Sequence, residues 1–195
     1  HDVDIALDAC TGVEFATFMK QYMEQYHQEK LGKIGVIAAN PAQSKHLETA
    51  TMKIFGVEVD FCNLRAETYA DDSRIPTAML GTPLEDSYRR DFTINSLYLT
   101  PSGEVIDYHH GLQDIQSGVI RFIGDPHERL AEDYLRVLRY FRFYARFGQL
   151  PPDEKTSAAL TAAATHLTSL SGERVAQEMR KILASGSRAT LTLMN

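Results

Sequence analysis

The sequence predicts an α+β protein with a mixed α/β part over residues 1–124 and an all-helical part over residues 125–195. In the first part, short runs that alternate apolar and polar residues are bounded by glycine and polar turns, which is typical of strands. In the second part, apolar residues recur at helical spacing behind capping residues. The length of 195 residues fits one or two domains of about 100–200 residues each.

The first elements are predicted from alternation and from turn residues. Residues 2–7 alternate and indicate a strand, and residues 13–28 have helical spacing. Residues 48–64 indicate a hairpin that turns at Gly56. In its second strand, Asp60 is expected to face away from the apolar residues.

Residues 66–86 are polar and are predicted to form a mobile surface loop. Thr82 followed by Pro83 is typical of a helix start. This helix is expected to continue through Arg89, Arg90, Asp91 and Asn95. A second hairpin over residues 98–108 and a short strand over residues 119–123 complete the first part.

Helices alone are predicted after residue 124. A capping motif at Asp125 precedes one long helix that is expected to reach residue 147 and to stop at Gly148. An alanine-rich helix is expected over residues 153–166. A third helix is expected over residues 171–184.

The charge of the chain is distributed unevenly. The net charge is −6 at pH 7, which argues against a uniformly basic nucleic-acid-binding protein. Residues 1–124 hold 10 basic and 18 acidic residues, a net of −8, whereas residues 125–195 hold 10 and 8, a net of +2. An acidic part joined to an arginine-rich part suits a cation site beside an anion site.

Cysteine usage and hydropathy narrow the class of protein further. Cys10 and Cys62 form neither a C-x-x-C motif nor a disulfide framework, so we expect a reducing compartment, cytoplasmic or mitochondrial. No apolar run approaches the ~18 residues that a transmembrane helix needs, so no membrane partner is expected. The oligomeric state is not predicted by any of these features.

Two acidic residues share one face of the first predicted strand. Asp2 and Asp4 are two positions apart, so both carboxylates point the same way. Paired carboxylates favour a bound divalent cation, and Asp60 would add a third if its strand lies beside the first. Such a cluster can hold Mg²⁺ for nucleotidyl transfer. The alternative is an edge strand with solubilising charges, which a lone D-x-D pattern favours.

Four arginines occupy one face of the predicted long helix. At 100° per residue, they fall within one 120° sector, and Tyr140 and Phe143 point toward the same side. The arginines are Arg136, Arg139, Arg142 and Arg146. This face either pairs with acids elsewhere in the chain or binds phosphate, whose oxygens match the guanidinium fork.

Asp133 and Arg136 lie one turn apart on this helix and place an acceptor beside donors. The pairing edges of cytosine and adenine present an amino donor next to a ring acceptor, whereas uracil and guanine present a carbonyl next to a ring N–H. The pair would therefore accept CTP and ATP and disfavour UTP and GTP. Correct hydrogen bonding is worth ~1–3 kcal/mol per contact.

The motifs together resemble one family, the class II tRNA nucleotidyltransferases and bacterial poly(A) polymerases. R-R-D-F-T-I-N at residues 89–95 resembles its RRDxTIN motif, and Asp2-Val3-Asp4 resembles its catalytic DxD. G-L-Q-D-I at 111–115 resembles its G-x-x-D-L segment. E-D-Y-L-R-V-L-R at 132–139 resembles its EDxLRxLR motif. S-G-E-R at 171–174, with Glu178 and Lys181, resembles a further family helix.

The resemblance implies a polymerase-β-like nucleotidyltransferase head with a mixed sheet, over residues 1–124, and a helical nucleotide-recognition neck. It implies addition of C, C and A to the 3′ end of tRNA from CTP and ATP with Mg²⁺. By position, metal binding falls to Asp2 and Asp4, and contact with the nucleotide's sugar and phosphates to Arg90. Base recognition falls to Asp133 and Arg136, and the rest of the nucleotide pocket to Arg139 and Arg142.

The family also has a GGxVRD segment upstream of DxD, and the sequence begins at His1, after that point. We therefore expect either an N-terminally incomplete head or a loss of that phosphate-binding segment. Alternative functions are a poly(A) polymerase, a partial CC- or A-adding relative, or a non-catalytic RNA-binding or scaffold derivative.

Overall fold

The structure is a computed structural model that describes residues 3–28, 30–37, 48–68, 77–185 and 188–194. Backbone contacts divide the chain into two compact units, His1–Arg89 and Arg90–Asn195. The domain boundary near residue 124 followed from a change in sequence texture, and it stays a prediction. In the described ranges no helix has both the length and the apolar character to cross a bilayer.

The first unit is built on a four-stranded mixed sheet with the order β1-β4-β3-β2. β1 runs parallel to β4, and the other pairs are antiparallel. This confirms the predicted mixed sheet. The strands are β1 (Val3–Leu7), β2 (Gly35–Ile37), β3 (Thr49–Ile54) and β4 (Val57–Asn63).

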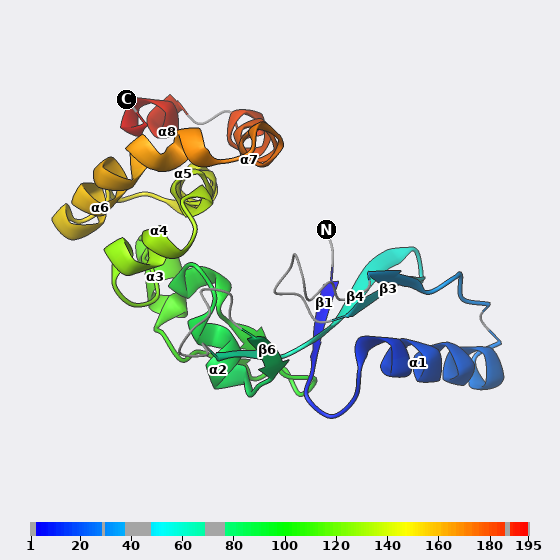
Figure 1. The fold of residues 1–195 in the computed structure, drawn as a ribbon. Coiled ribbons are helices and arrows are strands. Elements are labelled where there is room, and N and C mark those ends of the chain that lie inside the picture. The colour runs from blue at the N-terminus through cyan, green and yellow to red at the C-terminus, as the bar shows by residue number, and fades with distance from the viewer. Residues whose placement is uncertain (1–2, 29, 38–47, 69–76, 186–187, 195) are drawn as a thin grey trace. The chain divides into compact units, whose positions relative to one another are not determined.

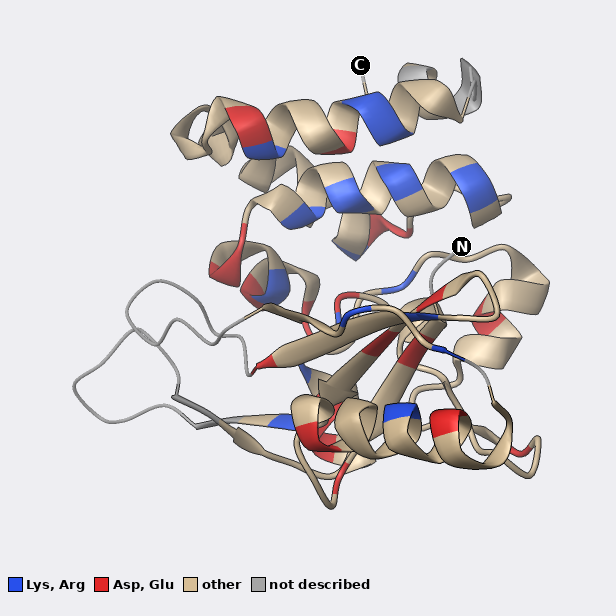
Figure 2. Ribbon diagram, turned by 90° about the vertical axis from the view of Figure 1, so that its right-hand side faces the viewer, with Lys and Arg blue, Asp and Glu red and all other residues tan. Residues whose placement is uncertain are grey.

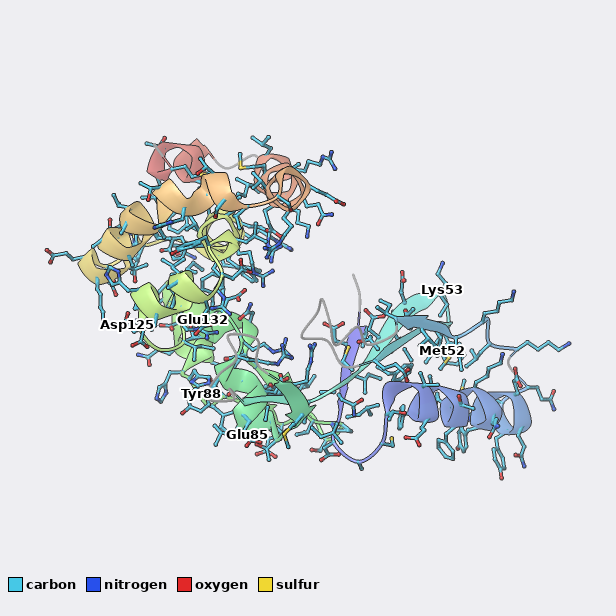
Figure 3. The ribbon with its side chains drawn as sticks, in the orientation of Figure 1. Met52, Lys53, Glu85, Tyr88, Asp125 and Glu132 are labelled. Atoms are coloured by element: carbon cyan, nitrogen blue, oxygen red, sulfur yellow. The ribbon has the colours of Figure 1, made fainter. Side chains whose placement is uncertain are left out.

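One face of this sheet is covered by α1 (Gly12–Tyr26) (Figure 1). Alternation along each strand sends one set of side chains into the core with α1 and the other set away from it. Met52 points toward α1 and its neighbour Lys53 points to the opposite side (Figure 3). The buried core residues are Ala16, Met23, Leu31, Ala50, Met52, Val59 and Phe61.

The β3–β4 hairpin turns where the sequence predicts. Phe55 and Gly56 both adopt positive φ, at 49° and 79°. Glycine tolerates a positive φ at no steric cost, which explains Gly56 at this turn. The interpretation of residues 66–86 as a loop is wrong at both flanks, because β5 (Arg65–Thr68) and β6 (Thr77–Leu80) form an antiparallel pair. Residues 69–76 lie outside the described residues.

The helix predicted at Thr82 begins there but is short. α2 (Pro83–Tyr88) has a capping box between Thr82 and Glu85. It ends before Arg90 and Asp91, contrary to the prediction. Phe92 is fully buried and bridges to Phe122, so tertiary pairing draws the chain out of the helix. The strand expected over residues 119–123 does not form beyond this single bridge at Phe122.

The second unit contains one short hairpin and a set of packed helices. Its core joins aromatic side chains to the apolar faces of α4, α5, α6 and α7, as the cluster of Phe92, Phe122, Leu130, Val137, Leu160 and Ile182 shows. The elements are η1 (Thr93–Asn95), β7 (Tyr98–Leu99), β8 (Val105–Ile106), α3 (Gly111–Ser117), α4 (Pro126–Glu132), α5 (Leu135–Phe147), α6 (Glu154–Ala164), η2 (Thr165–Ser169), α7 (Gly172–Ala184) and α8 (Arg188–Leu193).

The single long helix predicted after Asp125 is two helices, α4 and α5, with a break at Asp133. Asp133 adopts an extended conformation, with φ −157° and ψ 106°. Its side chain accepts a hydrogen bond from the Leu135 N–H (3.1 Å), as a capping aspartate does at a helix start. The position expected for Tyr140 is also wrong, because its side chain is fully buried in the core rather than facing solvent with the arginines.

We predict that Gly12→Ala destabilises the first unit. A Cβ at Gly12, the first residue of α1, would lie 2.3 Å from the Phe61 carbonyl oxygen, and overpacking of this kind costs about 1–3 kcal/mol. Gly32→Ala is the matched control in the same unit, because a Cβ there meets nothing within 4 Å. Thermal unfolding followed by circular dichroism measures both. Equal melting temperatures for the two variants would contradict the close packing of α1 on the sheet.

Candidate active site

The face of the sheet opposite α1 brings two predicted acidic residues together. Asp4 on β1 and Asp60 on β4 are register partners in a parallel pair, so their side chains project from the same face about 4.8 Å apart at the backbone. Thr51 on β3 is the partner of Asp60 on its other side. The neighbouring strand that the sequence analysis required for Asp60 is therefore present, whereas Asp2 lies outside the described residues.

Cys62 lies on the same face of the sheet, and the pKa of its thiol is affected by the nearby carboxylates. Burial raises the pKa of Cys62, and the negative charges of Asp4 and Asp60 raise it further. A hydrogen bond with Thr49 and the charge of Arg65 oppose the rise. Both cysteines of the chain are free thiols. Within the described ranges no group of three or more His, Cys, Asp or Glu side chains is arranged to hold a metal ion.

A buried carboxylate holds two arginines of α5. Asp91 is 8% exposed and accepts hydrogen bonds from Arg136 Nε (3.0 Å) and from Arg139 Nε (2.5 Å). Arg136 also donates to Glu132 (2.5 Å) and to the carbonyl oxygen of Arg129 (2.6 Å) at the end of α4. Burial alone would lower the pKa of Arg136, but Glu132 and Asp91 outweigh it and the pKa is raised. Arg136 is therefore a fixed, charged donor.

The predicted base-recognition residues are adjacent at the break between α4 and α5. Asp133 accepts the Leu135 N–H on Oδ1 and a hydrogen bond from Arg174 Nη2 of α7 (2.8 Å) on Oδ2. An ionised carboxylate has about four acceptor sites, so two remain. Among the contacts of the described residues, Nη2 of Arg136 donates to no protein atom. Acceptor and donor sites are thus both open at this corner.

Of the two remaining arginines of α5, Arg142 is paired with an acidic residue and Arg146 is not, among the described residues. Arg142 donates to Glu178 of α7 (2.8 Å), a carboxylate that is 5% exposed. Burial and the neighbouring Arg139 lower the pKa of Arg142, and Glu178 opposes the shift. Arg146 forms no ion pair within the described part of the chain. Basic residues follow one another along α5 in Figure 2. Pairing with acids, the first of the two interpretations of this face, therefore accounts for Arg136, Arg139 and Arg142.

Arg90 lies at the edge of the same unit. Its guanidinium carbon is 6.0 Å from the ring centroid of Tyr98, and its carbonyl oxygen accepts from Arg129 Nη2 (2.8 Å). Asn95 lies outside the helix that was predicted to include it: it ends η1, and its side-chain oxygen accepts the Phe92 N–H (3.1 Å). Its position after Arg90 and Asp91 therefore serves the backbone turn.

The G-x-x-D segment supports this turn. Asp114 is buried and accepts from Thr93 Oγ1 (2.7 Å) and from Arg121 Nε (3.2 Å). Gly111 lies so close to Thr93 that a Cβ would be 2.2 Å from its carbonyl oxygen. The two motifs at residues 89–95 and 111–115 are thus one packed structure that presents Arg90 and Asp91.

The sequence indicated no particular partner for each arginine. Three acidic residues and one arginine that position the site were therefore not predicted. Asp91, Glu132 and Glu178 hold the arginines of α5, and Arg174 holds Asp133. Two signals were available. Glu132 and Arg136 are four residues apart within the predicted long helix, and Arg174 and Glu178 are four residues apart on one face of α7. Nothing local to the sequence connects that face to α5.

Two family models match the sequence. The model for the poly A polymerase head domain matches residues 1–121, and the model for the probable RNA and SrmB-binding site of polymerase A matches residues 149–195. The mixed sheet and the helices that follow it have the fold of a polymerase-β-like nucleotidyltransferase. The chain belongs to the poly A polymerase head-domain family.

Solved structures with similar folds are CCA-adding enzymes. An apo form of a CCA-adding enzyme has a TM-score of 0.74 at 28% identity, covering 99% of this chain and 42% of that chain. The Bacillus stearothermophilus enzyme in complex with CTP has a TM-score of 0.71 at 28% identity over 100% of this chain and 42% of that one. A tRNA nucleotidyltransferase with a primer tRNA and an ATP analogue has a TM-score of 0.69 at 26% identity, covering 99% and 50%.

Curated relatives include fungal mitochondrial enzymes. The chain is 44% identical over 191 residues to the mitochondrial CCA tRNA nucleotidyltransferase of Saccharomyces cerevisiae, covering 94% of this chain and 35% of the relative. It is 43% identical to the Candida glabrata counterpart, covering 94% and 36%. The chain therefore spans about a third of the length of the curated relatives it matches.

We predict that Asp60→Asn makes the thiol of Cys62 more acidic. Removing a negative charge beside the thiolate stabilises it, so the pH midpoint of alkylation should fall from a value above the usual ~8.5 of cysteine. The measurement is the rate of iodoacetamide modification against pH in a Cys10→Ser background. Glu58→Gln, on the same strand and the same face, is the matched control. An unchanged midpoint in Asp60→Asn would contradict the shared acidic face.

Proposed function

We propose that this protein is a template-independent nucleotidyltransferase that adds C, C and A to the 3′ end of tRNA from CTP and ATP. The activity named for its fungal relatives supports the proposal. In the reaction, the 3′ hydroxyl oxygen of the RNA forms a bond to the α-phosphorus of the nucleotide. The bond from that phosphorus to pyrophosphate breaks, and the hydroxyl proton is lost.

The observation that carries the proposal is the fixed corner formed by Asp133 and Arg136. Arg174 and the Leu135 N–H orient the carboxylate, while Asp91 and Glu132 orient the guanidinium. Each group keeps unused acceptor or donor sites, so together they match a base edge with an amino donor beside a ring acceptor. Donors that are already oriented lose little entropy when the base binds.

This geometry would favour C and A through matched hydrogen bonds and would disfavour U and G through mispaired donors and acceptors. A uracil or guanine carbonyl placed at Asp133 would face a carboxylate, and its ring N–H would face the donors of Arg136. Burying such mispaired groups costs ~1–3 kcal/mol per contact. The protein side chains would thus do the work of a template. Arg90 completes the proposal as the contact to the sugar and phosphates, and Arg139 and Arg142 form the rest of the nucleotide pocket.

The acidic sheet face suits a hard divalent cation such as Mg²⁺. Asp4 and Asp60 offer carboxylate oxygens in register on neighbouring strands, and oxygen ligands are those that Mg²⁺ prefers. Asp2 and Asp4 would hold the ion, with Asp60 beside them. When bound, the ion would neutralise phosphate charge and make the attacking hydroxyl more acidic.

The free thiols of Cys10 and Cys62 fit a reducing compartment. Because the fungal relatives are named as mitochondrial enzymes, we assign this protein to mitochondria.

Incubation of a tRNA transcript that lacks its terminal CCA with CTP, ATP and Mg²⁺, followed by sequencing of the 3′ ends, tests the activity. We expect C, C and A in that order, and Asp4→Ala should abolish addition without a change in melting temperature, because Asp4 is exposed. Glu58→Ala is the control on the same face. A run of A alone would indicate a poly(A) polymerase, partial products a CC- or A-adding enzyme, and no addition a non-catalytic RNA-binding derivative. Normal turnover in Asp4→Ala would reject the metal role.

We predict that Asp133→Ala weakens selection against UTP and GTP. Loss of the acceptor removes one contact of ~1–3 kcal/mol, so the preference for CTP over UTP should fall about tenfold or more. Single-nucleotide incorporation kinetics measure this ratio. Asp125→Ala is the matched control, because Asp125 also caps a helix start of the same unit, through the N–H groups of His127 and Glu128. Unchanged discrimination in Asp133→Ala would reject base recognition by this residue.

A further inference from the structure

A second cationic site lies at the other end of α5. A cavity of about 700 Å³ opens between the C-terminal turns of α5 and α7. The side chains that matter for its chemistry are three cations and two aromatic rings: Arg142, Arg146 and Lys181, with Phe143 and Phe147. Arg146 is ten residues beyond Arg136 on α5, which places the two about 15 Å apart along the helix axis. The cavity therefore shares Arg142 with the proposed nucleotide pocket, but Arg146 and Phe147 lie at its end away from the corner at Asp133.

The charge of this cavity is only partly neutralised by the protein. Glu178 is shared by Arg142 at 2.8 Å and by Lys181 at 3.7 Å, and Arg146 has no acidic partner in the described part of the chain. Three cations therefore face one carboxylate. The Lys181 side chain is 58% exposed, so its ammonium remains available to an anion. The other arginines of α5 are held by acids, which makes this excess of positive charge local to the cavity.

Of the two aromatic rings beside these cations, Phe147 is exposed and Phe143 packs against the core. Phe147 is 42% exposed, and its ring centroid is 5.3 Å from the guanidinium carbon of Arg146. Phe143 has the same relation to Arg142, at 5.0 Å, and the two rings are 6.3 Å apart with 31° between their planes. Cations beside accessible aromatic faces are the combination by which proteins bind single-stranded nucleic acid, through phosphate charge and base stacking.

We propose that this cavity binds the single-stranded 3′ segment of the RNA, with a backbone phosphate at Arg146 and Lys181 and an unstacked base on Phe147. The inference rests on the proposed function, since it supplies the acceptor strand of that reaction. The shared chemistry is a phosphate group, which an RNA chain and a nucleoside triphosphate both offer. The exposed ring and the distance from the Asp133 corner favour the chain over the nucleotide. The RNA-binding family model covers α7, which contributes Lys181.

The test compares two ligands on one set of variants of the full-length protein. Fluorescence anisotropy measures the affinity for a short labelled single-stranded RNA ending in CC, over a series of salt concentrations, and calorimetry measures the affinity for CTP. The variants are Arg146→Gln combined with Lys181→Gln, and Phe147→Ala with Phe147→Tyr as its conservative partner. Arg180→Gln is the matched control, because Arg180 is an exposed residue beside Lys181 on α7 that does not line the cavity.

We expect the double variant to bind RNA about tenfold more weakly and to lower the salt slope by about 1.4, since two phosphate-neutralising charges are lost and each contributes about 0.7 on a single strand. Phe147→Ala should weaken RNA binding about tenfold at every salt concentration, and Phe147→Tyr should retain it, because stacking needs only an aromatic face. CTP affinity should stay within about twofold of the parent's, and Arg180→Gln should leave both affinities at the parent's values.

Three results would overturn the inference: RNA affinity in the double variant equal to that of the parent, a loss of CTP affinity as large as the loss of RNA affinity, or no RNA binding by the parent protein. The proposed function fails by a different result, the absence of nucleotide addition to a tRNA transcript. A protein that adds CCA but binds RNA equally well with and without Arg146 and Lys181 would therefore reject this inference alone.

Discussion

The buried carboxylate of Asp91 is the interaction on which the arginine face of α5 depends. Arg136 and Arg139 are one turn apart, where like charges repel each other. Asp91 accepts a hydrogen bond from each of them, so it turns a repulsive pair into one rigid group. A buried ion pair contributes little net stability, because desolvation offsets the attraction. Its effect is to fix the geometry: the edge of Arg136 that remains open is set by the edges that Asp91 and Glu132 occupy.

α7 applies the same principle from the other side. Its Arg174 holds Asp133 at the start of α5, and its Glu178 holds Arg142 further along. Because Arg174 and Glu178 are four residues apart, one face of α7 reaches both positions. The packing of α7 on α5 therefore helps to determine where the acceptor of the corner proposed for base recognition lies, although that corner is formed by Asp133 and Arg136 alone.

Elements with local signals could be predicted from the sequence. The capping box at Thr82, the turn at Gly56 and the alternation that separates Asp60 from Phe61 all depend on neighbours within a few residues. The break at Asp133 could not be predicted, since no glycine or proline precedes it and the capping role of its side chain depends on where α5 starts.

The pairing of the site residues could not be predicted from the sequence, for a different reason. The helical wheel placed the arginines on one face correctly, because α5 is helical from Leu135 to Phe147. The ion pairs of these arginines depend on Asp91 and Glu178, and each of these acids is more than thirty residues from its partner along the chain. The register of Asp4 with Asp60 likewise required a parallel pairing between distant strands. The roles assigned to the predicted site residues all stay predictions: Asp2, Asp4, Arg90, Asp133, Arg136, Arg139 and Arg142.

The uneven pairing of arginines along α5 suits two different binding tasks. Under the proposed function, an incoming nucleotide would be chosen by its base, which requires donors held in one geometry, and Arg136 and Arg139 are held by Asp91 at the end next to Asp133. The end of the RNA would change with every addition, so a site that holds it would have to accept any base. Phosphate charge and aromatic stacking are indifferent to base identity, and both are concentrated at the end of α5 where Arg146 lacks an acidic partner among the described residues. Selectivity and tolerance can therefore coexist on one helix, because acids neutralise one end and leave the other end charged.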